Sequence, residues 1–134
     1  MKKIIINTDG GSRGNPGPAA IGAVLSSEGG EVIAKYNECI GETTNNIAEY
    51  KALILALTRL ADFEYDEAEC RLDSELVVKQ FNGLYKVKDS NMKDLYGQVQ
   101  DLIFFKPIKF VHVRREYNKL ADQLVNEALD KAGF

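Results

Sequence analysis

The sequence has no tryptophan, one histidine, two cysteines and three prolines in 134 residues. Cys39 and Cys70 are not arranged as C-x-x-C, and with a single histidine this argues against a zinc site and favours free thiols in a reducing compartment. No apolar run is long enough to cross a membrane, because Lys51 and Arg59 interrupt the longest one. The first residues, MKKIIINTDGG, also lack the apolar length of a signal peptide, so we expect a cytoplasmic protein without a membrane partner.

Neither sign of charge dominates, since 17 Lys and Arg residues stand against 20 Asp and Glu residues for a formal net charge of −3. The molecule as a whole therefore does not attract nucleic acid, and a polyanionic partner would have to meet a local basic patch. With 45% hydrophobic residues the chain can bury a core. No repeat, low-complexity tract or linker divides it, so we expect a single domain over residues 1–134.

The hydrophobic pattern predicts an α/β fold in the order βββαβααβα. The hairpin turn SEGG joins the second and third expected strands, and the first three strands are expected to form an antiparallel meander. The pattern then changes to helical spacing, and we expect Thr44 and Ser90 to be the N-caps of two helices. The expected strands are 3–9, 19–26, 31–38, 68–73 and 108–113, and the expected helices are 43–63, 74–82, 90–103 and 118–132.

Three acidic residues lie near the ends of expected strands or at the start of a helix, and each has an ordinary structural explanation. Asp9 follows the apolar run Ile4–Ile6 and precedes a glycine-rich segment, so it could be a turn residue. Glu49 falls in the first turn of the first expected helix, where it would interact favourably with the helix dipole. Asp73 ends an expected strand and could cap the helix that starts at Ser74.

A fourth acid, Asp122, is harder to explain as a solvated side chain. It lies beside the apolar helix face that contains Val125 and Leu129, and a buried acid without a partner is costly. Four acids at one edge of a sheet would repel one another unless divalent cations lay between them, and Mg²⁺ is typically held by carboxylates, waters and phosphates. Two such ions about 3.5–4 Å apart are the usual arrangement for attack on a phosphodiester.

Four segments resemble, in the same order, segments of the type 1 ribonucleases H: TDGGSRGNPGPAAIG (8–22), TTNNIAEYKALILAL (43–57), LDSELVVKQFNG (72–83) and REYNKLADQLVNEAL (115–129). The resemblance implies a ribonuclease H-like fold, which is a five-stranded mixed sheet with its first three strands antiparallel, flanked by helices. The metal-binding catalytic carboxylates that it implies are Asp9, Glu49, Asp73 and Asp122. They would hold two Mg²⁺ ions, for which Mn²⁺ could substitute.

The implied reaction is two-metal-ion hydrolysis of the RNA strand in an RNA·DNA hybrid, leaving 5′-phosphate and 3′-hydroxyl ends, and a monomer would suffice for it. Members of the family read the minor groove of the hybrid, where the ribose 2′-hydroxyl separates RNA from DNA. The first loop would lie along the RNA, two asparagines in the minor groove and a threonine on a DNA phosphate, although helix-start chemistry also explains the asparagines. The residues carried over are Gly11, Ser12, Arg13, Gly14 and Asn15 in the loop, then Asn45 and Asn46, and Thr44.

The sequence departs from the family pattern in the loop before the last acid, where many members carry a histidine. The loop is short here, and the only histidine, His112, falls within an expected strand, where it could be an ordinary solvent-facing residue. We therefore expect Arg114 or Arg115 to take over the role in proton transfer or product release, with His112 as the alternative.

A second departure is the absence of the long basic handle, rich in tryptophan, with which some members grip the DNA strand. Residues 81–94 are too few for the extra helix. Lys79, Lys86, Lys88 and Lys93 could form a modest phosphate-binding surface, or simply a solvated loop. We expect weaker binding to hybrid than that of relatives with the handle.

Two other functions are compatible with such a fold, because a fold does not dictate an activity. A nucleic-acid-binding module without catalysis could keep it, but that module would not need all four acids. A nuclease of the same fold could act on double-stranded RNA or on DNA transposition ends, although the two asparagines and the glycine-rich loop favour the hybrid.

Overall fold

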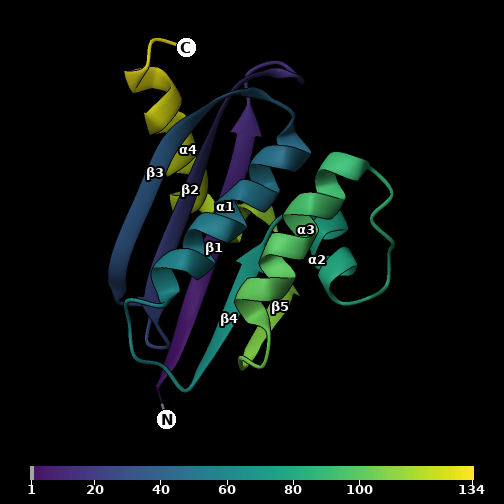
Figure 1. Ribbon diagram of the computed structural model, residues 1–134. Helices are drawn as coiled ribbons and strands as arrows, with labels where there is room; N and C mark the ends of the chain where they lie inside the picture. Colours follow the sequence, from purple (N-terminus) through teal and green to yellow (C-terminus); the bar gives the residue numbers. More distant parts are fainter. Residues whose placement is uncertain (1) are drawn as a thin grey trace.

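Residues 2–134 are described by a computed structural model, in which helices pack on both faces of one sheet (Figure 1). The strands are β1 (Lys3–Ser12), β2 (Gly17–Ser27), β3 (Val32–Thr43), β4 (Glu67–Leu72) and β5 (Ile108–His112). The helices are α1 (Asn45–Leu60), α2 (Glu75–Phe81), α3 (Ser90–Ile103) and α4 (Lys119–Lys131), with a short 3₁₀ helix, η1 (Arg115–Tyr117).

β1 lies at the centre of the sheet, whose strand order is β3-β2-β1-β4-β5. It pairs antiparallel with β2, which pairs antiparallel with β3, and it pairs parallel with β4, which pairs parallel with β5. The predicted mixed sheet, its antiparallel first three strands and the predicted order of elements are confirmed. Because β1 and β4 run in the same direction, the C-terminal end of β4 lies beside Thr8 of β1, and β1 continues past it to Ser12.

The two faces of the sheet carry different helices. Successive strand residues point to opposite faces, so Leu25 of β2 lies in the main core with Leu53 of α1, whereas Val24 packs against Leu124 of α4. α1 and α3 cover the first face and α4 covers the second (Figure 1). Among residues 2–134, no helix combines the length and the apolar character that crossing a bilayer would require.

The first strand is longer than predicted. β1 continues three residues past Asp9, because its pairing with β2 extends to the pair Ser12 and Ala19. Asp9 therefore lies inside a strand, and its interpretation as a turn residue is wrong. The sequence pattern did not predict this length, because Gly10 and Gly11 have low strand propensity. The pairing of β1 with β2 determines where the strand ends.

One of the two predicted helix caps is confirmed. The Oγ1 of Thr44 accepts the backbone N–H of Ile47 at 3.3 Å, as expected for the N-cap of α1. The N-cap of α3 is Asp89 rather than Ser90, since the Asp89 carboxylate accepts the backbone N–H of Asn91 at 2.9 Å. Asp and Ser are both good N-caps, so their adjacency left the sequence without a means to choose.

Candidate active site

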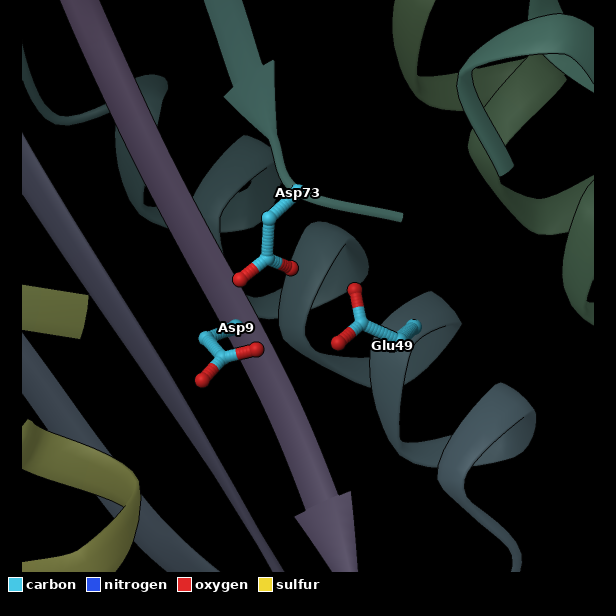
Figure 2. A group of neighbouring side chains, drawn as sticks. All are labelled: Asp9, Glu49 and Asp73. Carbon is cyan, nitrogen blue, oxygen red and sulfur yellow. The ribbon is translucent and has the colours of Figure 1, made fainter. Parts of the chain in front are cut away.

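Three carboxylates from separate parts of the chain lie close together where β4 ends beside β1 (Figure 2). Asp9 comes from β1, Glu49 from α1, and Asp73 from the residue that directly follows β4. Each offers an oxygen atom, and these three atoms all lie within 4.8 Å of one another. Asp9 and Glu49 are only 7% exposed. We call these three residues the carboxylate cluster.

Parallel pairing of β1 and β4 brings Asp9 and Asp73 together. Thr8 of β1 is the register partner of Leu72 of β4, so the residue after each lies at the same level of the sheet. The idea that Asp73 caps α2 is wrong, because the cap is Ser74, whose Oγ accepts the backbone N–H of Val77 at 3.4 Å. The carboxylate of Asp73 is not needed for that purpose.

Glu49 reaches the carboxylate cluster from the second turn of α1. No acidic residue occupies the first turn, so the helix-dipole explanation of Glu49 is wrong. Its Oε1 accepts the backbone N–H of Gly10 at 3.1 Å. Its buried Oε2 has no hydrogen-bond partner among the described residues. An orphaned carboxylate oxygen beside two further acids is the donor set that a divalent cation would complete.

The carboxylate cluster resists ionisation. Burial is the main cause that raises the pKa of Asp9 from 3.8 to about 7; a hydrogen bond with Glu49 opposes the rise, and the charges of Asp73 and Asp122 add to it. Burial, followed by the charge of Asp9, raises the pKa of Glu49 well above 4.5. Burial also raises the pKa of Asp73, against hydrogen bonding from Asn118 and the charge of Arg115. No cationic side chain offsets the burial of Asp9 and Glu49, and a bound divalent cation would supply that positive charge.

Asp122 lies beside the carboxylate cluster rather than within it. It is in the first turn of α4, its side chain is 32% exposed, and it contributes to the raised pKa of Asp9. An Asp122 oxygen lies 3.8 Å from a guanidinium nitrogen of Arg115, so this acid has a cationic partner.

A cleft of about 470 Å³ opens over the four acids. Five of the eight residues that the resemblance placed on the substrate line this cleft, namely Gly11, Ser12, Arg13, Asn45 and Asn46. Gly14, Asn15 and Thr44 do not line it. Asn15 instead supports the cleft wall, because its Oδ1 accepts the backbone N–H of Asn45 at 3.0 Å.

The amide of Asn45 has a fixed orientation. Its Oδ1 accepts both the backbone N–H and the hydroxyl of Ser12, at 2.8 and 3.1 Å. Since the oxygen is occupied, the amide nitrogen is the group left to contact a ligand, and it can only donate.

Arg13 is held against α4. Its guanidinium is 2.7 Å from the carboxylate of Asp130 and 3.4 Å from the amide oxygen of Asn126, and it also contacts the backbone carbonyl of Phe134. No local pattern in the sequence indicates these contacts, which join residues more than 100 positions apart.

Of the three residues considered for the role of the loop histidine, only Arg115 lines the cleft. The side chain of Arg114 is 80% exposed and lies 3.7 Å from Glu116. His112 is the last residue of β5, as its place in an expected strand implied, and it is exposed.

Asn118 is a site residue that the sequence did not single out. It is 1% exposed, its amide nitrogen donates to the backbone carbonyl of Thr8 at 2.8 Å, and its amide oxygen accepts from Asn7 at 3.0 Å. It thereby ties the start of α4 to β1, one residue before Asp9. Its position at the start of the helix expected over 118–132 was the available signal, but helix-start chemistry alone explains an asparagine there.

Comparison with known proteins finds relatives that are named ribonucleases. Residues 7–128 match the model of the family described as reverse transcriptase-like. Ribonuclease HI of Halobacterium salinarum is 47% identical over 125 residues, which are 92% of this chain and 63% of that protein. A bifunctional protein of Mycobacterium tuberculosis is 44% identical over 97% of this chain and 36% of its own length. The chain thus spans less than two thirds of these two relatives.

The solved structure of LC11-RNase H1 in complex with an RNA/DNA hybrid matches with a TM-score of 0.92 and 48% sequence identity. The match covers 96% of this chain and 98% of that one. At this identity and coverage, together with the family model, the comparison establishes more than a shared fold. The chain belongs to the ribonuclease H family, in its type 1 branch.

Proposed function

We propose that this protein is an endoribonuclease that hydrolyses the RNA strand of RNA·DNA hybrids and leaves 5′-phosphate and 3′-hydroxyl ends. The observation that carries the proposal is the carboxylate cluster, in which three acids from separate elements lie within 4.8 Å of one another at the floor of an open cleft. Holding three acids close together lowers the stability of the folded state. A function that uses them is therefore the simplest explanation for their presence.

The carboxylate cluster and the neighbouring Asp122 fit two divalent cations, which we propose to be Mg²⁺, with Mn²⁺ as a substitute. The hard carboxylate oxygens, the orphaned Oε2 of Glu49 and the scarcity of positive charge around Asp9 support this choice. Bound ions of this kind supply an activated water and stabilise the leaving 3′-oxygen.

The protein's own residues would select and orient the substrate. Asn45, whose amide can only donate, suits the hydrogen-bond acceptors of a minor groove, and Asn46 lines the same wall of the cleft. Gly11, which has no side chain, would let a sugar-phosphate backbone approach closely. Arg115, beside Asp122, is the residue that we assign to the role of the loop histidine. Because a guanidinium keeps its proton at neutral pH, that role would be product release rather than proton transfer.

Several further properties belong to the same proposal. A single domain acting as a monomer would suffice, since all four acids come from one chain. The absence of a C-x-x-C pair is compatible with work in the cytoplasm. The partner would be an RNA·DNA hybrid, and support comes from the similarity to LC11-RNase H1, which was crystallised with one.

The decisive test compares cleavage of RNA·DNA, RNA·RNA and DNA·DNA duplexes of one sequence in Mg²⁺ or Mn²⁺, for the wild type, Asp73→Asn and Asp101→Asn. Asp101 is an exposed acid of α3 and serves as the matched control. We expect the wild type and Asp101→Asn to cut the hybrid and Asp73→Asn to be slower by about 100-fold or more. No cleavage of hybrid in either metal, or an Asp73→Asn rate equal to wild type, would refute the proposal; equal cutting of RNA·RNA would widen its substrate class.

A further inference from the structure

Two glycines flank Asp9 in the sheet, one along the chain and one across it. Gly10 follows Asp9 in β1, and Gly22 of β2 is the direct register partner of Asp9. Because neighbours along a strand point to opposite faces whereas register partners point to the same face, the two glycines face opposite sides of the sheet.

Gly10 allows α1 to touch the sheet. A Cβ atom on Gly10 would lie 2.2 Å from the backbone carbon of Ala48 and 2.5 Å from the backbone nitrogen of Glu49. These are main-chain atoms, so α1 itself would have to move away. The same close approach lets the N–H of Gly10 donate to Glu49 Oε1 at 3.1 Å.

Gly22 allows α4 to touch the opposite face. A Cβ atom on Gly22 would lie 2.7 Å from the backbone oxygen of Ala121 and 3.0 Å from the Cβ of Leu124. Again a main-chain atom is in the way, and α4 would have to shift. The residue that follows Ala121 is Asp122.

Both contacts share one arrangement, in which a glycine beside Asp9 touches the backbone of the alanine that precedes a helix-borne acid. We propose that Gly10 and Gly22 are positioning residues that set how closely Glu49 and Asp122 approach Asp9, and hence how tightly the site binds divalent metal. This inference rests on the proposed function. Not every glycine of the region has this role, since a Cβ on Gly11 would lie 3.7 Å from Val125, an ordinary contact.

The test measures Mn²⁺ affinity by calorimetry in the absence of nucleic acid, for the wild type, Gly10→Ala, Gly22→Ala and Gly97→Ala. Gly97 of α3 is the control because a Cβ there meets nothing within 4 Å. We expect Gly97→Ala to bind like the wild type and each of the other two to bind about 10- to 100-fold more weakly. On hybrid substrate, kcat should fall by about 100-fold while KM changes by less than about threefold.

Double variants separate positioning from general destabilisation. If Gly10 acts through Glu49, then Gly10→Ala should cost no further Mn²⁺ affinity in a Glu49→Gln background, yet its full effect should persist in an Asp122→Asn background. The reverse should hold for Gly22→Ala. A glycine that merely supports the fold would give additive losses in both backgrounds.

The outcomes distinguish this inference from the proposed function. A wild type that neither binds Mn²⁺ nor cuts hybrid would remove the function and the inference together. A wild type that does both, beside alanine variants with unchanged Mn²⁺ affinity or with additive losses, would overturn the inference alone. So would loss of the circular dichroism spectrum in both alanine variants, because the glycines would then serve the whole fold rather than the site.

Discussion

Replacing Asp9 with asparagine should stabilise the metal-free protein while it abolishes activity. The folded state raises the pKa of Asp9 from 3.8 to about 7, mainly through burial. A raised pKa means that the protonated acid favours folding, so this contribution is complete below pH 3.8 and is lost as the pH rises through 7. Above that pH, the wild type must hold a buried negative charge that Asp9→Asn does not have.

The structure sets the size of the effect. The difference between pKa values of 3.8 and about 7 corresponds to roughly 4 kcal/mol in the free energy of unfolding at pH 9. At pH 5 less than half of this penalty is present, because most of the folded protein still carries the proton. The advantage of Asp9→Asn should therefore grow by about 3 kcal/mol between pH 5 and pH 9. The side chain is 7% exposed, so solvent screening reduces this value little.

The assay is urea unfolding followed by circular dichroism, with EDTA present, at pH 5 and pH 9. Asp101→Asn, which removes an exposed acid of α3, is the control and should show no such growth with pH. Saturating Mg²⁺ should reduce or reverse the advantage of Asp9→Asn, because the wild type gains binding free energy that the variant lacks. The reasoning would be refuted if the free energies of unfolding of Asp9→Asn and the wild type differed by the same amount at both pH values. It would also be refuted if Asp9→Asn were less stable than the wild type at pH 9.

Three more outcomes follow from the site. Arg115→Ala should lower kcat on hybrid by about tenfold or more, and by more than Arg114→Ala or His112→Ala, because only Arg115 lines the cleft; rate measurements with the reverse order would contradict this. Asn118→Ala should lower the free energy of unfolding by about 1–3 kcal/mol, because the backbone carbonyl of Thr8 would lose its buried donor. Urea unfolding measures this value, and a free energy equal to that of the wild type would contradict the prediction. Filter binding across a salt series should show weaker affinity for hybrid than that of a ribonuclease H with a basic handle, and a smaller dependence of affinity on salt concentration. Equal affinity and equal salt dependence would contradict the expectation that this protein contacts fewer phosphates.

Local patterns predicted the elements and their order well. The change from strand character to helical spacing after Thr43 marks α1, and the Thr44 cap is confirmed at 3.3 Å from the N–H of Ile47. Such features depend on neighbours three or four residues apart, which the sequence displays directly. Where two adjacent residues suit the same place, as Asp89 and Ser90 do before α3, the pattern could not choose between them.

The site depends on contacts between residues far apart in the chain. Taken alone, Asp9, Glu49 and Asp73 each had an ordinary explanation as a turn residue, a helix-dipole partner or a cap, and the structure removes all three. The resemblance in four segments brought these acids forward, together with Asp122. No local pattern could have indicated that Asn118 ties α4 to β1, because its partners lie about 110 residues away.

The sequence by itself determined which elements form, their order, and which acids are available near the strand ends. Only the tertiary structure decided that Glu49 is buried with one unpaired oxygen, that Asp122 stands beside the carboxylate cluster with Arg115, and that Arg13 is held by α4. The physical reason is one of range. Periodicity and capping act within a few residues, whereas the environment of a carboxylate depends on which distant backbones approach it, and here two glycines allow α1 and α4 to come close.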